Sequence, residues 1–135
     1  MGSSSAFYFR RGKNDLEYKT VAGRTAGFMK KIDFLLVGIN AKYIHLNPAL
    51  YSLKYSVPET LRECVSVAEY TINHVYEHIL MDIVGRQPDV IGISSYIWNI
   101  ETVRMLCCDL AKVLPHVPIW LGGPEAAWSD DRLFE

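Results

Sequence analysis

Pro88 to Trp98 reads Pro-Asp-Val-Ile-Gly-Ile-Ser-Ser-Tyr-Ile-Trp, and this stretch decides the fold. Its first half, Val90 to Ile93, is apolar without a polar face, and the small hydroxyl residues Ser94 and Ser95 follow directly. A short run that is apolar on both faces is typical of a buried parallel strand. Because ligands of open α/β sheets bind beyond the carboxyl ends of the strands, Ser94 and Ser95 are candidate binding residues.

Similar patterns on both sides of this strand predict a chain in which strands and helices alternate. Apolar runs predict further strands over 32–39, 63–70 and 118–121. Apolar positions at helical spacing predict helices over 47–57, from Thr71 or Asn73 to 85, and over 99–114. With such short connections, this order predicts an α/β fold: a parallel sheet with right-handed crossovers and helices on both faces.

The domain organisation divides the chain near residue 28. Residues 1–28 mix glycine, serine, basic and aromatic residues without a period, and we expect a leader or a disordered tail there. Residues 29–135 are enough for one α/β domain. Because a fifth strand and helix would complete such a sheet, we expect this domain to be incomplete at its carboxyl end, as a piece cut from a longer protein after the fourth strand.

Composition excludes several classes of protein. The net charge is -1, so no general nucleic-acid surface is expected. The three cysteines, Cys64, Cys107 and Cys108, form no CxxC pattern, which favours reduced thiols over disulfides, a zinc ribbon or an iron–sulfur cradle. No apolar run approaches the roughly 18 residues that span a bilayer. We therefore expect a cytoplasmic protein without a nucleic-acid or membrane partner.

Three loops, at 40–47, 94–98 and 122–125, are expected to meet at the carboxyl edge of the sheet. Residue types exclude common sites there: the chain has no GxxxxGK[ST] phosphate loop, no glycines after the first strand for a dinucleotide, no acidic cluster of a phospho-acceptor receiver and no GxSxG nucleophile elbow. What remains is a cleft lined by hydroxyl groups, by aromatic side chains and by the backbone of Gly122 and Gly123.

Small residues at strand ends let a large ligand approach the backbone closely, and hydroxyl groups and amides can then bind its polar part. Taken singly, each motif also has a purely structural explanation: Ser94 caps a turn, or Gly122-Gly123 bends the chain. The aromatic residues of the predicted cleft are Tyr43, Tyr96 and Trp98.

Taken together, three segments carry a resemblance: Asn40–His45 (Asn-Ala-Lys-Tyr-Ile-His), Ser94–Asn99 (Ser-Ser-Tyr-Ile-Trp-Asn) and Leu121–Glu125 (Leu-Gly-Gly-Pro-Glu). From about Lys30 onward the chain resembles the cobalamin-binding domain at the amino end of many radical S-adenosylmethionine proteins. The resemblance implies a flavodoxin-like (Rossmann-like), three-layer fold. The nucleotide tail of the cofactor would descend into a groove between the sheet and the helices.

The same resemblance assigns places to individual residues. Ser94 and Tyr96 fall where a Ser-x-Leu motif meets the tail, and Gly122 and Gly123 fall where a Gly-Gly pair lets the tail pass. The full set implied to contact the cofactor is Asn40, Lys42, Tyr43, His45, Ser94, Ser95, Tyr96, Gly122, Gly123, Pro124 and Glu125. No residue is predicted to be catalytic or to ligate a metal.

The first loop departs from the family pattern. Cobalamin domains that bind cobalt through histidine carry Asp-x-His-x-x-Gly, whereas here Tyr43 replaces the aspartate and Pro48 the glycine, and only His45 remains. Because a ligating histidine needs an acceptor that fixes its tautomer, we expect His45 to be a loop contact that leaves cobalt without a protein imidazole. The other histidines and cysteines are not expected to be ligands.

The resemblance implies a cobalamin-binding module of a larger radical S-adenosylmethionine enzyme. A downstream domain would hold S-adenosylmethionine and an iron–sulfur cluster, with methyl transfer as a candidate reaction. No acid–base or nucleophile–base pair stands out, so the piece itself is not expected to turn over substrate. The alternative is a stand-alone small α/β enzyme or regulatory domain that binds a small anionic metabolite through Ser94, His45 and Glu125.

Overall fold

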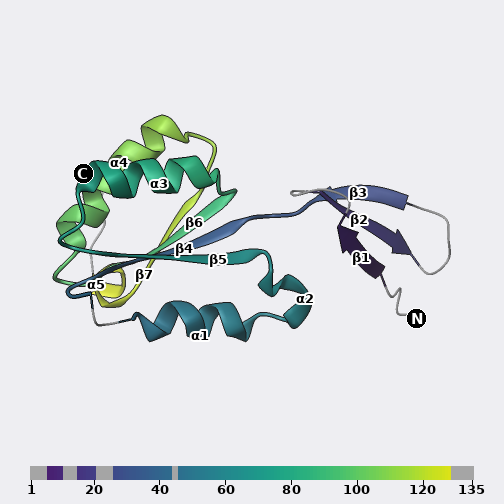
Figure 1. The fold of residues 1–135 in the computed structure, drawn as a ribbon, viewed down its shortest axis with the longest axis horizontal. Coiled ribbons are helices and arrows are strands. Elements are labelled where there is room, and N and C mark those ends of the chain that lie inside the picture. The colour runs from purple at the N-terminus through teal and green to yellow at the C-terminus, as the bar shows by residue number, and fades with distance from the viewer. Residues whose placement is uncertain (1–5, 11–14, 21–25, 44–45, 129–135) are drawn as a thin grey trace. The chain divides into compact units, whose positions relative to one another are not determined.

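A computed structural model describes residues 6–10, 15–20, 26–43 and 46–128, with backbone alone for residues 6–30 and for 127–128. The chain divides into two compact units, Met1–Ile32 and Asp33–Glu135. Figure 1 shows the elements of both units with their labels.

The described part of the first unit is an antiparallel sheet in the order β1-β2-β3. Its strands are β1 (Ala6–Arg10), β2 (Asp15–Thr20) and β3 (Ala26–Lys30). The sequence predicted no element here, because the segments are too short and mixed for a period to stand out, although their aromatic residues favour strands. That residues 1–28 are a leader or tail stays a prediction.

The second unit has the predicted α/β architecture. Its strands are β4 (Phe34–Asn40), β5 (Val65–Thr71), β6 (Val90–Ser94) and β7 (Ile119–Gly122). Among the described residues these strands form one parallel sheet in the order β5-β4-β6-β7. The predicted flavodoxin-like layout of strands and helices is thereby confirmed.

Helices cover both faces of this sheet. They are α1 (Pro48–Ser56), α2 (Glu59–Arg62), α3 (Tyr76–Arg86), α4 (Ile100–Val113) and α5 (Pro124–Trp128). Figure 1 shows α1 and α2 on one side of the sheet and α3 and α4 on the other. No helix of the described ranges is long and apolar enough to cross a membrane.

The main core lies between the sheet and α3 and α4. Alternate residues of β4 point to this side, and Val37 is fully buried, as is Ile91 of β6. Apolar residues at helical spacing in α4, such as Val103, Leu106 and Leu110, complete the core and are fully buried. The opposite face of the sheet faces α1 and carries both large residues, such as Phe34 and Trp120, and the glycines Gly38 and Gly92.

Three helix predictions need correction. Thr71 and Asn73 do not cap α3: the N–H of Thr71 donates to Nδ1 of His74 at 2.9 Å, which forms a turn, and the helix begins only at Tyr76. A second short helix, α2, follows Pro58, because proline is tolerated just before a new helical turn. The segment predicted as the last loop contains the start of α5, with Pro124 as its first residue.

Candidate functional site

The carboxyl ends of β4, β6 and β7 lie at one edge of the sheet, as the sequence predicted. Val37 of β4 pairs with Ile93 of β6, and Ser94 of β6 pairs with Gly122 of β7. The described parts of the three predicted loops therefore leave the sheet side by side.

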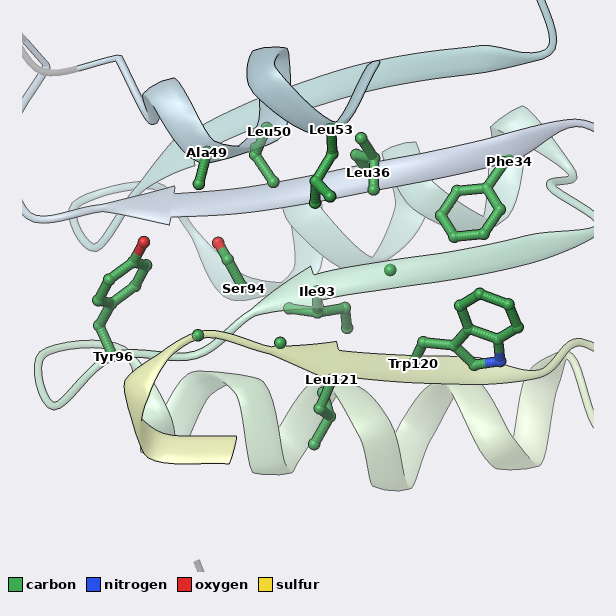
Figure 2. Close-up of a pocket in the computed structure, with 13 residues that line it drawn as sticks. Phe34, Leu36, Ala49, Leu50, Leu53, Ile93, Ser94, Tyr96, Trp120 and Leu121 are labelled. Atoms are coloured by element: carbon green, nitrogen blue, oxygen red, sulfur yellow. The ribbon is translucent and has the colours of Figure 1, made fainter. Parts of the chain in front are cut away.

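A groove runs between α1 and the sheet, and we call it the α1 groove. Its volume is about 220 Å³. Figure 2 shows the side chains of α1 pointing toward the sheet across this space. The groove is lined by Phe34, Leu36, Ala49, Leu50, Leu53, Gly92, Ile93, Ser94, Tyr96, Trp120, Leu121, Gly122 and Gly123.

Polar and apolar groups lie at opposite ends of the α1 groove. The hydroxyl oxygens of Ser94 and Tyr96 lie near the first turn of α1, and the rings of Phe34 and Trp120 lie at the far end (Figure 2). These two rings pack edge to face, with centroids 5.4 Å apart. The groove is thus suited to a long ligand that is polar toward the sheet edge and apolar under α1.

A second hollow, which we call the edge hollow, adjoins the first at Tyr96. It has a volume of about 250 Å³ and is lined by Asn40, Ala41, Leu46, Asn47, Pro48, Tyr96 and Trp98. The rings of Tyr96 and Trp98 stack with centroids 4.4 Å apart and planes 7° from parallel. The indole N–H of Trp98 donates to the carbonyl oxygen of Ile39 at 3.2 Å, which fixes this pair over the end of β4.

Gly122 and Gly123 both line the α1 groove, but their surroundings differ. A Cβ built at Gly122 would meet no atom within 4 Å, so the space above this backbone is open. Gly123 has φ of +93°, and a Cβ there would lie 2.4 Å from the carbonyl oxygen of Ser95. The turn therefore requires glycine at position 123, whereas the glycine at position 122 leaves open space on the wall of the groove.

Ser95 is part of the scaffold of this edge. Its side chain is fully buried, and its hydroxyl donates to the carbonyl oxygen of Gly122 at 2.8 Å. Its N–H donates to the same oxygen, and its own carbonyl accepts from the N–H of Glu125. Ser95 thereby joins the ends of β6 and β7, and it does not line either hollow.

The remaining predicted residues are spread around the edge. Asn40 lines the edge hollow, while Lys42 and Tyr43 are exposed and line neither hollow. Pro124 and Glu125 begin α5 and also lie outside both linings. His45 lies outside the described residues.

The described histidines and cysteines form no metal-binding cluster, since no group of three potential ligands occurs in the part of the chain that the structure describes. Nδ1 of His74 accepts a hydrogen bond from the N–H of Thr71 at 2.9 Å, which places the proton of the neutral ring on Nε2. The Cys107 thiol is buried in the core, and burial raises its pKa to about 11. Cys107 is thus a structural thiol.

Three polar residues of the site were not predicted as such. Asn47 is buried and donates to Ser94. Glu69 on β5 accepts from both Asn40 and Asn47, and Asn99 donates to the ends of β4 and β6. The sequence held one signal: Glu69 is the one charged residue of β5, a strand of the sheet.

Comparison with known proteins identifies the family. A family model described as B12 binding domain matches residues 35–135. This range includes the elements from β4 to α5 and the lining of both hollows, with the single exception of Phe34. No curated protein and no solved structure matches the chain. The match covers well over half of the chain and the whole predicted binding edge, and the chain therefore belongs to the B12-binding domain family.

Proposed function

We propose that this chain is the cobalamin-binding module of a larger radical S-adenosylmethionine enzyme. The observation that supports this binding site is the α1 groove. Its lining includes Ser94, Gly122 and Gly123, which lie at or just after the ends of two strands and within the family match. When bound, a corrinoid supplies a cobalt centre able to carry a methyl group, and the protein supplies its position.

The nucleotide tail of the corrinoid lies in the α1 groove in this proposal. The open backbone at Gly122 gives it passage, and the hydroxyl groups of Ser94 and Tyr96 bind its polar atoms. The flat aromatic base lies against the apolar wall formed by residues such as Leu53 and Trp120. This lining suits an aromatic tail better than a small anionic metabolite, for which it offers few charged partners.

The edge hollow holds one side of the corrin ring in the same proposal. The stacked pair of Tyr96 and Trp98 provides a flat apolar surface there, and Asn40 provides an amide for the polar side chains of the ring. Because the two hollows meet at Tyr96, one ligand can occupy both.

Cobalt receives no protein imidazole in this proposal. His45 lacks the aspartate that would orient it, since Tyr43 stands at that position. His74, the described histidine beside Tyr43, has Nδ1 engaged by Thr71, and its ring packs against Tyr43 at 5.5 Å. Both observations favour a cobalt centre that is free of histidine.

The proposal of a downstream catalytic domain rests on the resemblance of the three loop segments to the cobalamin-binding domains of radical S-adenosylmethionine proteins. It would carry S-adenosylmethionine and an iron–sulfur cluster, and this chain would present the corrinoid to it. A CxxxCxxC motif in the reading frame beyond Glu135 supports this part of the proposal, and a stop codon there favours a stand-alone domain.

Cofactor retention tests the binding function. The purified chain, incubated with hydroxocobalamin and then desalted, should keep a corrinoid absorption spectrum in proportion to the protein. Elution without colour under several conditions, also from a chain extended with its downstream segment, would contradict the proposal.

A further inference from the structure

One row of residues crosses the sheet beneath the first turn of α1. Glu69 of β5 pairs with Gly38 of β4, and Ser94 of β6 pairs with Gly122 of β7. Because Val37 pairs with Ile93, Gly38 is also the neighbour of Ser94. In this row, Gly38 therefore lies between the carboxylate of Glu69 and the hydroxyl group of Ser94.

The missing side chain of Gly38 makes room for Leu50 of α1, and Asn47 lies in van der Waals range of the same position. A Cβ at Gly38 would lie 2.7 Å from Cδ1 of Leu50 and 3.6 Å from Nδ2 of Asn47. Asn47, the N-cap of α1, is buried in this space. It bridges the row: its N–H donates to Glu69 Oε1 at 2.7 Å and its Nδ2 donates to Ser94 Oγ at 2.9 Å.

The orientation of the Asn47 amide is fixed by chemistry. Oδ1 of Asn47 accepts from the backbone N–H of Ala49 at 3.2 Å, and a backbone N–H can only donate. The amide group must therefore turn its NH₂ toward Ser94. This assignment holds independently of any choice between the oxygen and nitrogen positions.

The Ser94 hydroxyl becomes a donor as a result. One lone pair of its oxygen is occupied by Asn47, and the hydroxyl donates to the carbonyl oxygen of Val37 at 3.4 Å, a long contact for a hydroxyl donor. A ligand atom in the α1 groove that bears a free lone pair would offer a better partner. Ser94 thus selects an acceptor, such as a ring nitrogen or a phosphate oxygen.

Glu69 holds Asn47 in place through a set of donors around its carboxylate. Asn40 Nδ2 donates to Oε1 at 3.1 Å, and the hydroxyl of Tyr51 donates to Oε2 at 2.7 Å. Burial raises the pKa of Glu69, but the hydrogen bonds from Asn47, Tyr51 and Asn40 outweigh it and leave the pKa below its ordinary value. The carboxylate is ionised at neutral pH and only accepts.

We propose that Glu69 and Asn47 are positioning residues that orient the Ser94 hydroxyl as a hydrogen-bond donor into the α1 groove. We call these three residues the Glu69–Asn47–Ser94 hydrogen-bond chain. This inference rests on the proposed function, since the acceptor it names belongs to the bound corrinoid.

A double-mutant cycle with the full chain tests this inference. Glu69→Ala, which removes the acceptor of the Asn47 N–H, and Ser94→Ala are made singly and together, and the affinity for hydroxocobalamin is measured by equilibrium dialysis. Each single variant should bind about 3- to 10-fold more weakly, the loss expected for one hydrogen bond. In the Ser94→Ala background, Glu69→Ala should cause no further loss.

Two further variants separate positioning from folding. Asn47→Ser keeps a side chain that can cap α1 but is too short to reach Ser94, and it should match Ser94→Ala. Asp82→Ala is the matched control, because Asp82 also accepts from a tyrosine hydroxyl, that of Tyr70, but lies on α3 away from both hollows. It should leave the affinity unchanged.

A measurement without cofactor completes the test. Glu69→Ala should speed hydrogen exchange at the backbone N–H of Asn47, and Asp82→Ala should not. Additive losses in the cycle, or no loss with Glu69→Ala, would overturn the hydrogen-bond chain alone. Failure of the unsubstituted chain to bind cobalamin would overturn the proposed function, and the hydrogen-bond chain with it.

Discussion

Gly122 and Gly123 are adjacent, but the structure gives them different tasks. Gly123 has a positive φ and lies against the backbone of Ser95, so it is a residue of the turn. Gly122 has open space above it, on the wall of the α1 groove. A sequence motif of two glycines therefore divides into one position that the turn requires and one that lies on the open wall of the groove.

Gly122→Val should abolish cobalamin binding and leave the fold intact. The Cβ of the new side chain has open space around it, and valine suits a strand, but the side chain would fill the passage of the nucleotide tail. Far-ultraviolet circular dichroism and retention of hydroxocobalamin after desalting provide the two measurements. Full retention by a folded variant would show that no ligand comes close to this backbone.

Gly85→Val is the control for this substitution. Gly85 lies on α3, a Cβ there also meets nothing within 4 Å, and it lies outside both hollows. Binding should be unchanged. Gly123→Ala should instead lower the free energy of unfolding by about 1–3 kcal/mol, because alanine is strained at positive φ.

His45→Ala should leave the visible spectrum of bound cobalamin unchanged. Loss of a loop contact removes at most one hydrogen bond, about 0.5–1.5 kcal/mol net, whereas loss of a cobalt ligand would shift the spectrum. Electron paramagnetic resonance of the cobalt(II) form gives the sharper measurement, because an axial imidazole nitrogen splits the cobalt lines into triplets. Triplets in the unsubstituted protein that vanish in His45→Ala would contradict a histidine-free centre.

At the scale of elements, Asn99 ties the start of α4 to two strand ends. It is almost fully buried, and its Nδ2 donates to the carbonyl oxygens of Ile39 and Ser94 at 3.0 and 3.1 Å. Its Oδ1 accepts from the N–H of Tyr96 at 2.8 Å. This side chain therefore sets the turn that carries Tyr96 between the two hollows.

Asn99→Ala should lower the free energy of unfolding by about 2–4 kcal/mol, because it leaves buried backbone groups of Ser94 and Tyr96 without their partner. Urea denaturation of both proteins gives the measurement. The matched control is Asn73→Ala at an exposed turn, where a change within about 0.5 kcal/mol is expected. An equal loss of unfolding free energy in both variants would show that Asn99 stabilises the fold no more than an exposed asparagine does.

Element types in the second unit could be predicted from sequence because burial dominates their pattern. For the apolar run of β6 and the apolar stripe of α4, one type of secondary structure buries the apolar side chains. Both elements lie where predicted. The short helices α2 and α5 lack such a stripe, and the start of α3 depends on the contact between Thr71 and His74. Local hydrogen bonds of this kind leave no periodic trace.

The site could be predicted only in part, for a related reason. Strand ends identify Ser94 and Gly122, since parallel strands bring their carboxyl ends to one edge. The apolar wall of the α1 groove, with Leu53 and Trp120, and the position of Asn47 above Gly38 arise from the packing of α1 on the sheet. That packing joins residues far apart in sequence, which no local pattern encodes.

At the scale of the whole molecule, the first 28 residues should be dispensable for cobalamin binding. The unit boundary lies at Ile32 and the family match begins at residue 35. A chain that begins at Met29 keeps β4 and every residue of both hollows, so its affinity and melting temperature should equal those of the full chain. A folded shortened chain with weaker binding would assign residues 1–28 a part in cofactor capture.

The two hollows are each walled by a tryptophan: Trp120 lies in the α1 groove and Trp98 in the edge hollow. A corrin ring absorbs light in the near-ultraviolet, where indole emits, so a corrinoid bound there would quench both by energy transfer. The protein thus contains its own optical reporters of occupancy. Trp120→Phe and Trp98→Phe, each compared with the unsubstituted chain, would show how much of that quenching each of the two indoles contributes.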